Sequence, residues 1–179
     1  CLDDLQALLD RVKQERDVKA IPEDAREALA ALLTDHFSVT HVLRIIALTY
    51  PSRIVVLESA WKSARCSEEF KRPKAALTLL LKFATSYWVA LNEGKGAVEA
   101  RKVFGKDGFA ATESETGMCN TRARKLRTFH YRDRKVEMLA HLKIGVKDSA
   151  AETLRVHFSW DTEERKLVIG YCGPHLDFS

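Results

Sequence analysis

The spacing of apolar residues changes along the chain from a helical period to strand alternation. Before residue 105 apolar residues recur every three or four positions, as in Leu2, Leu5, Leu8, Leu9 and Val12. This period predicts amphipathic helices. After residue 125 apolar and polar residues alternate, and that pattern predicts strands. The sequence therefore predicts an α+β fold, with helices first and strands last.

The helical part is expected to contain about six helices with short connections. Ser38 is expected to cap a helix that ends before Pro51, since the residue preceding proline disfavours the helical conformation. Pro73 opens the longest helix, KAALTLLLKFATSYWVALNEG, and a shorter helix covers 97–104. Between them, one apolar stripe predicts a further helix: Ile54, Val55, Leu57, Ala60 and Trp61.

Alternation in the last third predicts a small antiparallel sheet of about three or four strands. One strand is expected from Val136 to Ile144, and a hairpin joins 154–160 to 167–172 through the charged turn DTEERK. Phe129–Arg132 would add a further strand. A sheet of this size needs a partner for its apolar face, so we expect it to pack on the helices.

These elements predict three segments: a helical layer at 1–104, a connector of acidic and basic residues at 105–125, and an antiparallel sheet at 126–179. We expect them to form one cooperative unit. Because the sequence begins with Cys1 and not with methionine, we expect a fragment of a longer chain.

The cysteine spacing and the hydropathy pattern indicate a cytoplasmic protein. Cys1, Cys66, Cys119 and Cys172 form no CxxC pair, which favours free thiols in a reducing compartment. No apolar run is long enough to span a bilayer, and no secretion signal is seen. We therefore expect no membrane partner.

Positive charge is concentrated in Thr121–Lys135, TRARKLRTFHYRDRK, although the net charge of the chain is only +4. Such a concentration indicates a surface that faces a polyanion. Arginines would hold phosphates and the aromatic residues would stack on bases. The expected nucleic-acid-binding residues are Arg122, Arg124, Lys125, Arg127, Phe129, His130, Tyr131, Arg132 and Arg134.

The strand alternation also predicts a polar face on the sheet. If Trp160 lies opposite Leu167, then Phe158 faces Ile169 and Val156 faces Tyr171 on the apolar side. On the other side, His157 would lie opposite Gly170 and Arg155 opposite Cys172. That face would be exposed and would present a set of polar side chains: Glu137, His141, Lys143, Arg155 and His157. A register slip of one residue would reverse the two faces.

A cationic face with histidines suits RNA cleavage without a metal. One group removes the proton of the ribose 2′-hydroxyl, another protonates the leaving oxygen, and cations stabilise the charged intermediate. His141 and His157 are the expected proton-transfer groups, with His175 as a third candidate, because histidine titrates near neutrality. Arg155 and Lys143 would stabilise charge. This mechanism predicts no cofactor and no metal.

The C-terminal hairpin, LRVHFSWDTEERKLVIGYCGPHL, resembles the closing strands of the RelE/HigB-type small ribonuclease toxins of bacteria. The resemblance covers the C-terminal strands and not the helical part. It implies cleavage of messenger RNA by basic, histidine and tyrosine side chains. Arg155, Tyr171 and His175 are the nearest matches in this sequence.

Two alternatives stay open beside RNA binding with metal-free endoribonuclease activity. One is a non-catalytic interaction module of a larger protein, with a protein partner on the helical face. The other is a metal-dependent nuclease, because histidines and carboxylates together hold divalent cations. The residues available for such a site are His141, His157, His175, Glu113, Glu115 and Glu137.

Overall fold

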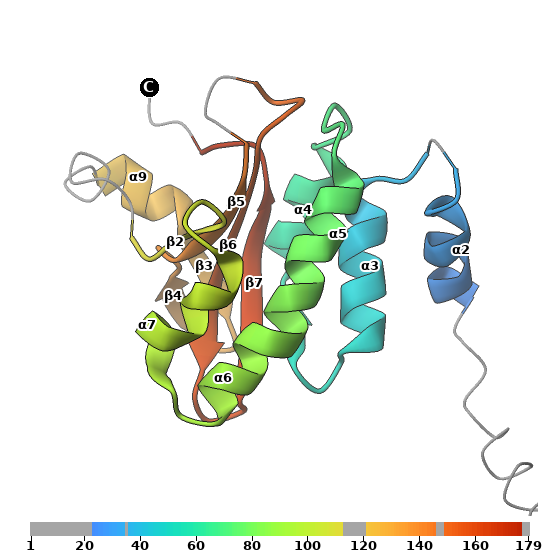
Figure 1. Cartoon of the computed structure of the whole chain (residues 1–179). Coiled ribbons are helices and arrows are strands. Elements are labelled where there is room, and N and C mark those ends of the chain that lie inside the picture. Colours follow the sequence, from blue (N-terminus) through green and yellow to red (C-terminus); the bar gives the residue numbers. More distant parts are fainter. Residues whose placement is uncertain (1–22, 35, 113–120, 146–148, 177–179) are drawn as a thin grey trace, which may run out of the picture.

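A sheet of five strands forms the centre of the protein, in the order β1-β7-β6-β5-β2. The computed structural model describes residues 23–34, 36–112, 121–145 and 149–176 (Figure 1). β1 pairs with β7 in parallel, and the other neighbours in this sheet are antiparallel. The strands of the central sheet are β1 (Ile54–Val56), β2 (Phe109–Ala110), β5 (His141–Ile144), β6 (Leu154–Asp161) and β7 (Lys166–Gly173). A second sheet contains β3 (Thr128–Tyr131) and β4 (Arg134–Glu137).

The class is α+β, but the predicted small antiparallel sheet of three or four strands at the C-terminal end is wrong. The central sheet is mixed, and two of its strands come from segments without strand alternation. β1 lies inside a segment that was expected to be helical. Its three β-branched residues favour a strand, but a run this short shows no measurable period. β2 lies in the expected connector and has only two residues.

The long alternating segment from Val136 to Ile144 forms parts of two sheets. β4 ends at Glu137 in the small sheet, and β5 begins at His141 in the central sheet. At the crossing, the Met138 N–H donates to the Arg127 carbonyl oxygen, and the Phe158 N–H donates to the Ala140 carbonyl oxygen. The alternation continues through this change of sheet, so it did not reveal the break.

Most of the helices lie on one side of the central sheet, and the small sheet with α9 lies on the other (Figure 1). The longest predicted helix is present, but its middle is a π-helical turn, η1 (Phe83–Tyr87). The short helix at 97–104 ends as a 3₁₀ turn, η2 (Arg101–Phe104). The α-helices are α2 (Glu23–Ala31), α3 (Val39–Thr49), α4 (Glu58–Arg65), α5 (Pro73–Lys82), α6 (Trp88–Asn92), α7 (Gly96–Ala100) and α9 (Thr121–Leu126).

The π-helical turn has partners that tie the long helix to the sheet. Arg53 Nη1 donates to the Ala84 carbonyl oxygen at 3.1 Å, and its guanidinium lies 4.4 Å from the Trp88 ring centroid. Trp88 Nε1 donates to the Arg165 carbonyl oxygen, in the turn between β6 and β7, at 2.8 Å. π-helical turns often mark functional sites, but here the contacts are structural.

The central sheet is buried on both faces. On one face, Leu142, Val156 and Phe158 pack with the helices in the larger core. On the other face, Val168 packs with Phe129, Tyr131 and Met138 of the small sheet and its exit in a second, smaller core. The protein therefore has three layers: helices, central sheet and small sheet. The third layer was not predicted, and it decides which polar side chains reach solvent.

The predicted hairpin of β6 and β7 is confirmed at its turn end. Trp160 lies opposite Leu167 and Phe158 lies opposite Ile169, as expected. Farther from the turn the predicted register is wrong, because a β-bulge leaves Gly170 without a partner. The observed pairs beyond the bulge are Val156 with Cys172, His157 with Tyr171, and Arg155 with Gly173.

Helix α4 satisfies backbone groups of β7 at this bulge. Ser59 Oγ donates to the Gly170 carbonyl oxygen at 2.6 Å, and the Cys172 N–H donates to Ser63 Oγ at 2.9 Å. β1 has ended by this point, so the two serines take over its pairing role along the edge of β7. Side chains of α4 thus bond the edge of β7 where β1 no longer pairs with it.

Candidate nucleic-acid site

Three polar side chains form a row across the central sheet. The register places His141 of β5 opposite His157 of β6, and His157 opposite Tyr171 of β7. The two imidazole centroids lie 4.7 Å apart, and those of His157 and Tyr171 lie 5.9 Å apart. The sequence correctly placed both histidines on one face of the sheet.

The prediction that this face is exposed is wrong. His157 is 1% exposed and His141 is 6% exposed. His157 Nδ1 donates to the Met138 carbonyl oxygen at 2.9 Å, and His141 Nδ1 donates to the Leu139 carbonyl oxygen at 3.0 Å. Burial, with the neighbouring His141 as a smaller cause, lowers the pKa of His157 to about 3. A buried, neutral imidazole of this kind is poorly placed to exchange protons with a polymer substrate.

The other groups around this row are also held in place. Arg127 is 1% exposed, and it donates from Nη1 to the Ala123 carbonyl oxygen and from Nη2 to the Leu176 carbonyl oxygen. Tyr171 donates its hydroxyl to the Pro174 carbonyl oxygen, and burial raises its pKa to about 12. His175 is half-buried and close enough to contribute to the low pKa of His157. Arg127 is therefore internal, and the prediction that it contacts phosphate is not supported by its burial.

The basic stretch Thr121–Lys135 forms α9, β3 and the start of β4, and two of its arginines, Arg124 and Arg132, have carboxylate partners. Arg124 contacts both carboxylate oxygens of Glu137, at 2.6 and 3.1 Å. This hydrogen bond is the main reason that the pKa of Glu137 is lowered. Arg132 contacts Glu164 at 2.9 Å and lies 3.9 Å from Asp161. Glu137 is thus the ion-pair partner of Arg124.

Phe129 and Tyr131 face inward and do not offer the predicted stacking surfaces. They are 8% and 7% exposed and pack in the smaller core. Alternation along β3 places His130 on the outer side. The exposed residues of the stretch include one acid, Asp133, and these basic or histidine side chains: Arg122, Arg124, Lys125, His130, Arg132, Arg134 and Lys135. The outer surface of this layer is basic, but the aromatic rings of Phe129 and Tyr131 are not part of it.

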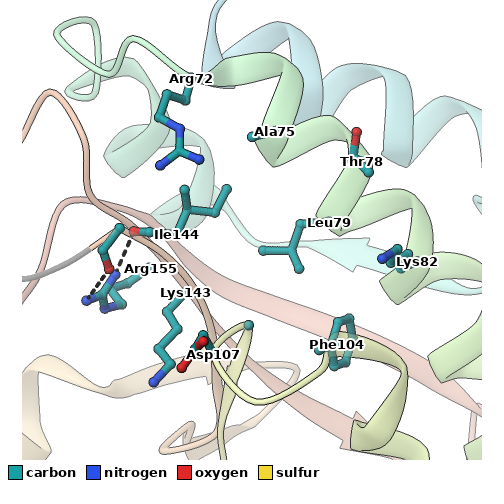
Figure 2. Close-up of a pocket in the computed structure, with 12 residues that line it drawn as sticks. Arg72, Ala75, Thr78, Leu79, Lys82, Phe104, Asp107, Lys143, Ile144 and Arg155 are labelled. Carbon is teal, nitrogen blue, oxygen red and sulfur yellow. Dashed lines mark hydrogen bonds between the residues drawn. The ribbon is translucent and has the colours of Figure 1, made fainter.

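A second cationic site lies beside the polar row, two residues farther along the paired strands β5 and β6. The next pair of the register, Lys143 and Arg155, borders a cavity of about 880 Å³ that extends to helix α5 (Figure 2). Four cations from three parts of the chain line it, and we call this cavity the α5–β5 pocket. Its lining residues are Arg72, Ala75, Thr78, Leu79, Lys82, Phe104, Asp107, Gly108, Lys143, Ile144, Gly145 and Arg155.

Among the described residues that line the α5–β5 pocket, four are cations and one, Asp107, is an acid. Among the described residues, no carboxylate oxygen lies within 4 Å of Lys82 or Lys143. Arg72 has a distant partner, Glu152, at 3.9 Å. A concentration of positive charge at one pocket attracts negative charge, so this pocket favours an anionic ligand.

Arg155 gives the pocket a fixed wall. It is 7% exposed, and Nη1 donates to the Ile144 carbonyl oxygen at 3.0 Å (Figure 2). Nη1 also donates to the Leu154 carbonyl oxygen at 2.9 Å. Nη2 reaches the Gly145 carbonyl oxygen at 3.4 Å. These bonds hold the guanidinium at the ends of β5 and β6. A positioned arginine is better suited to phosphate than a mobile one, because less side-chain entropy is lost on binding.

Sequence reasoning found two of the four pocket cations, Lys143 and Arg155, since they alternate with core residues on paired strands. It missed the two cations of the helical side, Arg72 and Lys82. Arg72 precedes α5, while Thr78 and Lys82 are four residues apart on α5, a spacing that places both on one face of the helix. That spacing was visible in the sequence, but nothing in it indicated that this face meets the end of β5.

The structure adds little to the metal and nucleophile hypotheses. Within the described ranges, no three side chains of histidine, cysteine or acidic type gather to hold a metal ion. Glu113 and Glu115 lie outside those ranges. Of the cysteines in the described part, Cys66 and Cys172 are both free. Cys172 is fully buried and its pKa is raised to about 12 by desolvation, so it does not act as a nucleophile.

No protein-family model, curated protein or solved structure matches this chain. The resemblance to RelE/HigB-type toxins therefore stays a prediction from the C-terminal strands. Across the described residues, none of the helices has the length and apolar character needed to cross a bilayer.

Proposed function

We propose that this protein binds nucleic acid, with RNA as the expected class, in the α5–β5 pocket. The observation that carries the proposal is that four cations, Arg72, Lys82, Lys143 and Arg155, line one pocket, with Asp107 as the acid among its described lining residues. Phosphate contacts from lysine and arginine supply most of the affinity of proteins for nucleic acids. The exposed cations of α9 and the small sheet would extend the positive electrostatic potential beyond the pocket.

Asp107 supports RNA over DNA as the ligand. A carboxylate among phosphate-binding cations repels phosphate, but it accepts a hydrogen bond from a ribose hydroxyl. The 2′-hydroxyl is the group that distinguishes RNA from DNA. We expect RNA to bind more tightly than DNA of the same sequence, and Asp107→Ala to reduce that preference.

The proposal is for binding without cleavage. The two histidines expected to transfer protons, His141 and His157, are buried under the small sheet. Of the predicted catalytic residues, Lys143 and Arg155 line the pocket, and neither was expected to transfer a proton. An apolar protein-docking surface on the helices is the contrasting function. Its affinity would be nearly independent of salt, whereas phosphate contacts are strongly salt-dependent.

Removing two pocket lysines is expected to reduce the salt dependence of RNA binding. Each phosphate contact to a single strand contributes about 0.7 to the slope of log K against log salt. The Lys82→Ala/Lys143→Ala variant should therefore lower the magnitude of the slope by about 1.4. Fluorescence anisotropy with a labelled RNA over a range of salt concentrations measures this slope.

The matched control is Lys125→Ala/Lys135→Ala, which removes two exposed lysines outside the pocket. We expect it to change the slope less than the pocket variant does. An RNA affinity without salt dependence, or a larger effect from the control pair, would contradict binding in the pocket.

A further inference from the structure

The α5–β5 pocket is not uniformly polar. Between its cations lie apolar side chains from three elements: Leu79 of α5, Ile144 of β5 and Phe104 of η2 (Figure 2). A phosphate group alone would gain nothing from contact with these apolar side chains. A ligand that satisfies both parts of the lining carries negative charge and an apolar, planar group.

We infer that the pocket accepts an unstacked base of a single-stranded nucleic acid against Phe104, with the flanking phosphates on Lys143, Arg155, Arg72 and Lys82. This inference rests on the proposed function and specifies the form of its ligand. A cavity of about 880 Å³ falls within the range of small-molecule sites, so it has room for a nucleotide.

Phe104 is held by other aromatic rings. Its centroid lies 5.2 Å from that of Tyr87 and 5.8 Å from that of Phe109, and the latter ring is nearly parallel to it, at 9°. Tyr87 and Phe109 in turn contact the buried ring of Phe158. Because these contacts fix the ring before a ligand arrives, stacking a base on it orders few additional groups.

The turn after Phe104 also has a fixed shape. η2 ends at Gly105, whose φ of 70° is a conformation that favours glycine. An added Cβ at Gly108 would lie 2.7 Å from the Phe104 carbonyl oxygen. The two glycines thus allow the segment to fold back on itself and place Phe104 and Asp107 on the same pocket.

The apolar wall discriminates between single strands and duplexes. In a duplex each base stacks on its neighbours and pairs across the helix, so its faces are not available to a protein ring. A duplex can reach exposed cations with its phosphates, but it cannot place a base on Phe104 without unpairing it. The α5–β5 pocket should therefore prefer single strands.

The test compares one short RNA, as a labelled single strand and in a duplex with its complement, at a fixed salt concentration. We expect the single strand to bind more tightly. Phe104→Leu keeps an apolar side chain but removes the stacking surface, so it should weaken single-strand binding roughly tenfold. It should leave duplex binding and the salt slope unchanged, because no phosphate contact is lost. Phe104→Trp should retain single-strand affinity.

Each outcome distinguishes the inference from the function on which it rests. The inference would be overturned by equal affinity for the single strand and the duplex, or by unchanged single-strand binding in folded Phe104→Leu. The proposed function would still stand in either case if Lys82→Ala/Lys143→Ala reduces the salt slope. No salt-dependent binding of either form would overturn both. Loss of binding by Phe104→Trp as well as Phe104→Leu, with the melting temperature unchanged, would also contradict stacking.

Discussion

Acidification is expected to destabilise this protein strongly between pH 6.5 and about pH 3. His157 has a pKa of about 3 in the folded protein, against 6.5 for an exposed histidine. The unfolded chain therefore binds more protons in this interval, and the free energy of unfolding falls as the pH falls. The full contribution is present above pH 6.5. Each pKa unit corresponds to about 1.4 kcal/mol, so the total loss should be roughly 5 kcal/mol.

Most of the groups facing His157 favour its neutral form. Arg127 adds positive charge, as do His141 and His175 when they are protonated. Tyr171 lies beside the ring and its raised pKa keeps it uncharged at these pH values. The Met138 carbonyl oxygen accepts the ring N–H and acts in the opposite direction, but burial outweighs it.

Urea denaturation at several pH values measures this effect. His157→Gln retains a donor for the Met138 carbonyl oxygen and does not titrate, so its stability should fall by less than that of the parent protein over this interval. His130→Gln is the matched control, since His130 is exposed. Parallel curves for the parent protein and His157→Gln would show that His157 is not the group responsible.

Adding a single methyl group at Gly170 is expected to dislodge the small sheet. A Cβ at this position would lie 2.5 Å from Phe129 Cδ2 and 2.6 Å from Met138 Sδ. Both neighbours belong to the smaller core, and they reach the backbone of β7 only because glycine has no side chain. Overpacking of a core costs about 1 to 3 kcal/mol, so Gly170→Ala should lower the free energy of unfolding by about 2 kcal/mol.

A double-mutant cycle separates this clash from other effects at the bulge. If the Cβ strikes the Phe129 ring, Phe129→Ala should make room for it, and the cost of Gly170→Ala should fall in that background. Chemical denaturation of the four proteins measures the coupling. Additive costs would mean that the contact with Phe129 is not the reason that this position requires glycine, and that Met138 or the bulge itself is.

These two predictions concern the layer that the sequence did not predict. Alternation placed His141 and His157 correctly on one face of the sheet, because side-chain direction follows directly from strand geometry. It did not indicate what covers that face. The hairpin that covers it, β3–β4, lies in the basic stretch. Because that stretch is rich in charged residues, its aromatic residues Phe129 and Tyr131 were expected to be exposed, but they face inward.

The errors in the sheet have local causes. β1 and β2 are too short to show a period, and each depends on pairing with a strand that is distant in sequence. The register failed beyond Phe158 because Gly170 forms a bulge, and a bulge is not visible in simple alternation. In contrast, the β6–β7 turn and the limits of the long helix follow from local residues, and these were predicted correctly.

The difference between local sequence patterns and tertiary packing also explains which residues of the candidate site were predicted. Lys143 and Arg155 were found because neighbouring strands place them side by side. Arg72, Lys82 and Phe104 join them only through tertiary packing, so no spacing in the sequence connects them. A charge-rich segment was the more visible signal, but ion pairs such as Arg124 with Glu137 neutralise part of it.

Lysine-reactive footprinting with and without RNA tests the central claim most directly. The account predicts that bound RNA reduces the labelling of Lys82 and Lys143 in the α5–β5 pocket, while Lys125 and Lys135 on the small-sheet side change less. Protection of Lys125 and Lys135, with Lys82 and Lys143 as reactive as in the free protein, would contradict it.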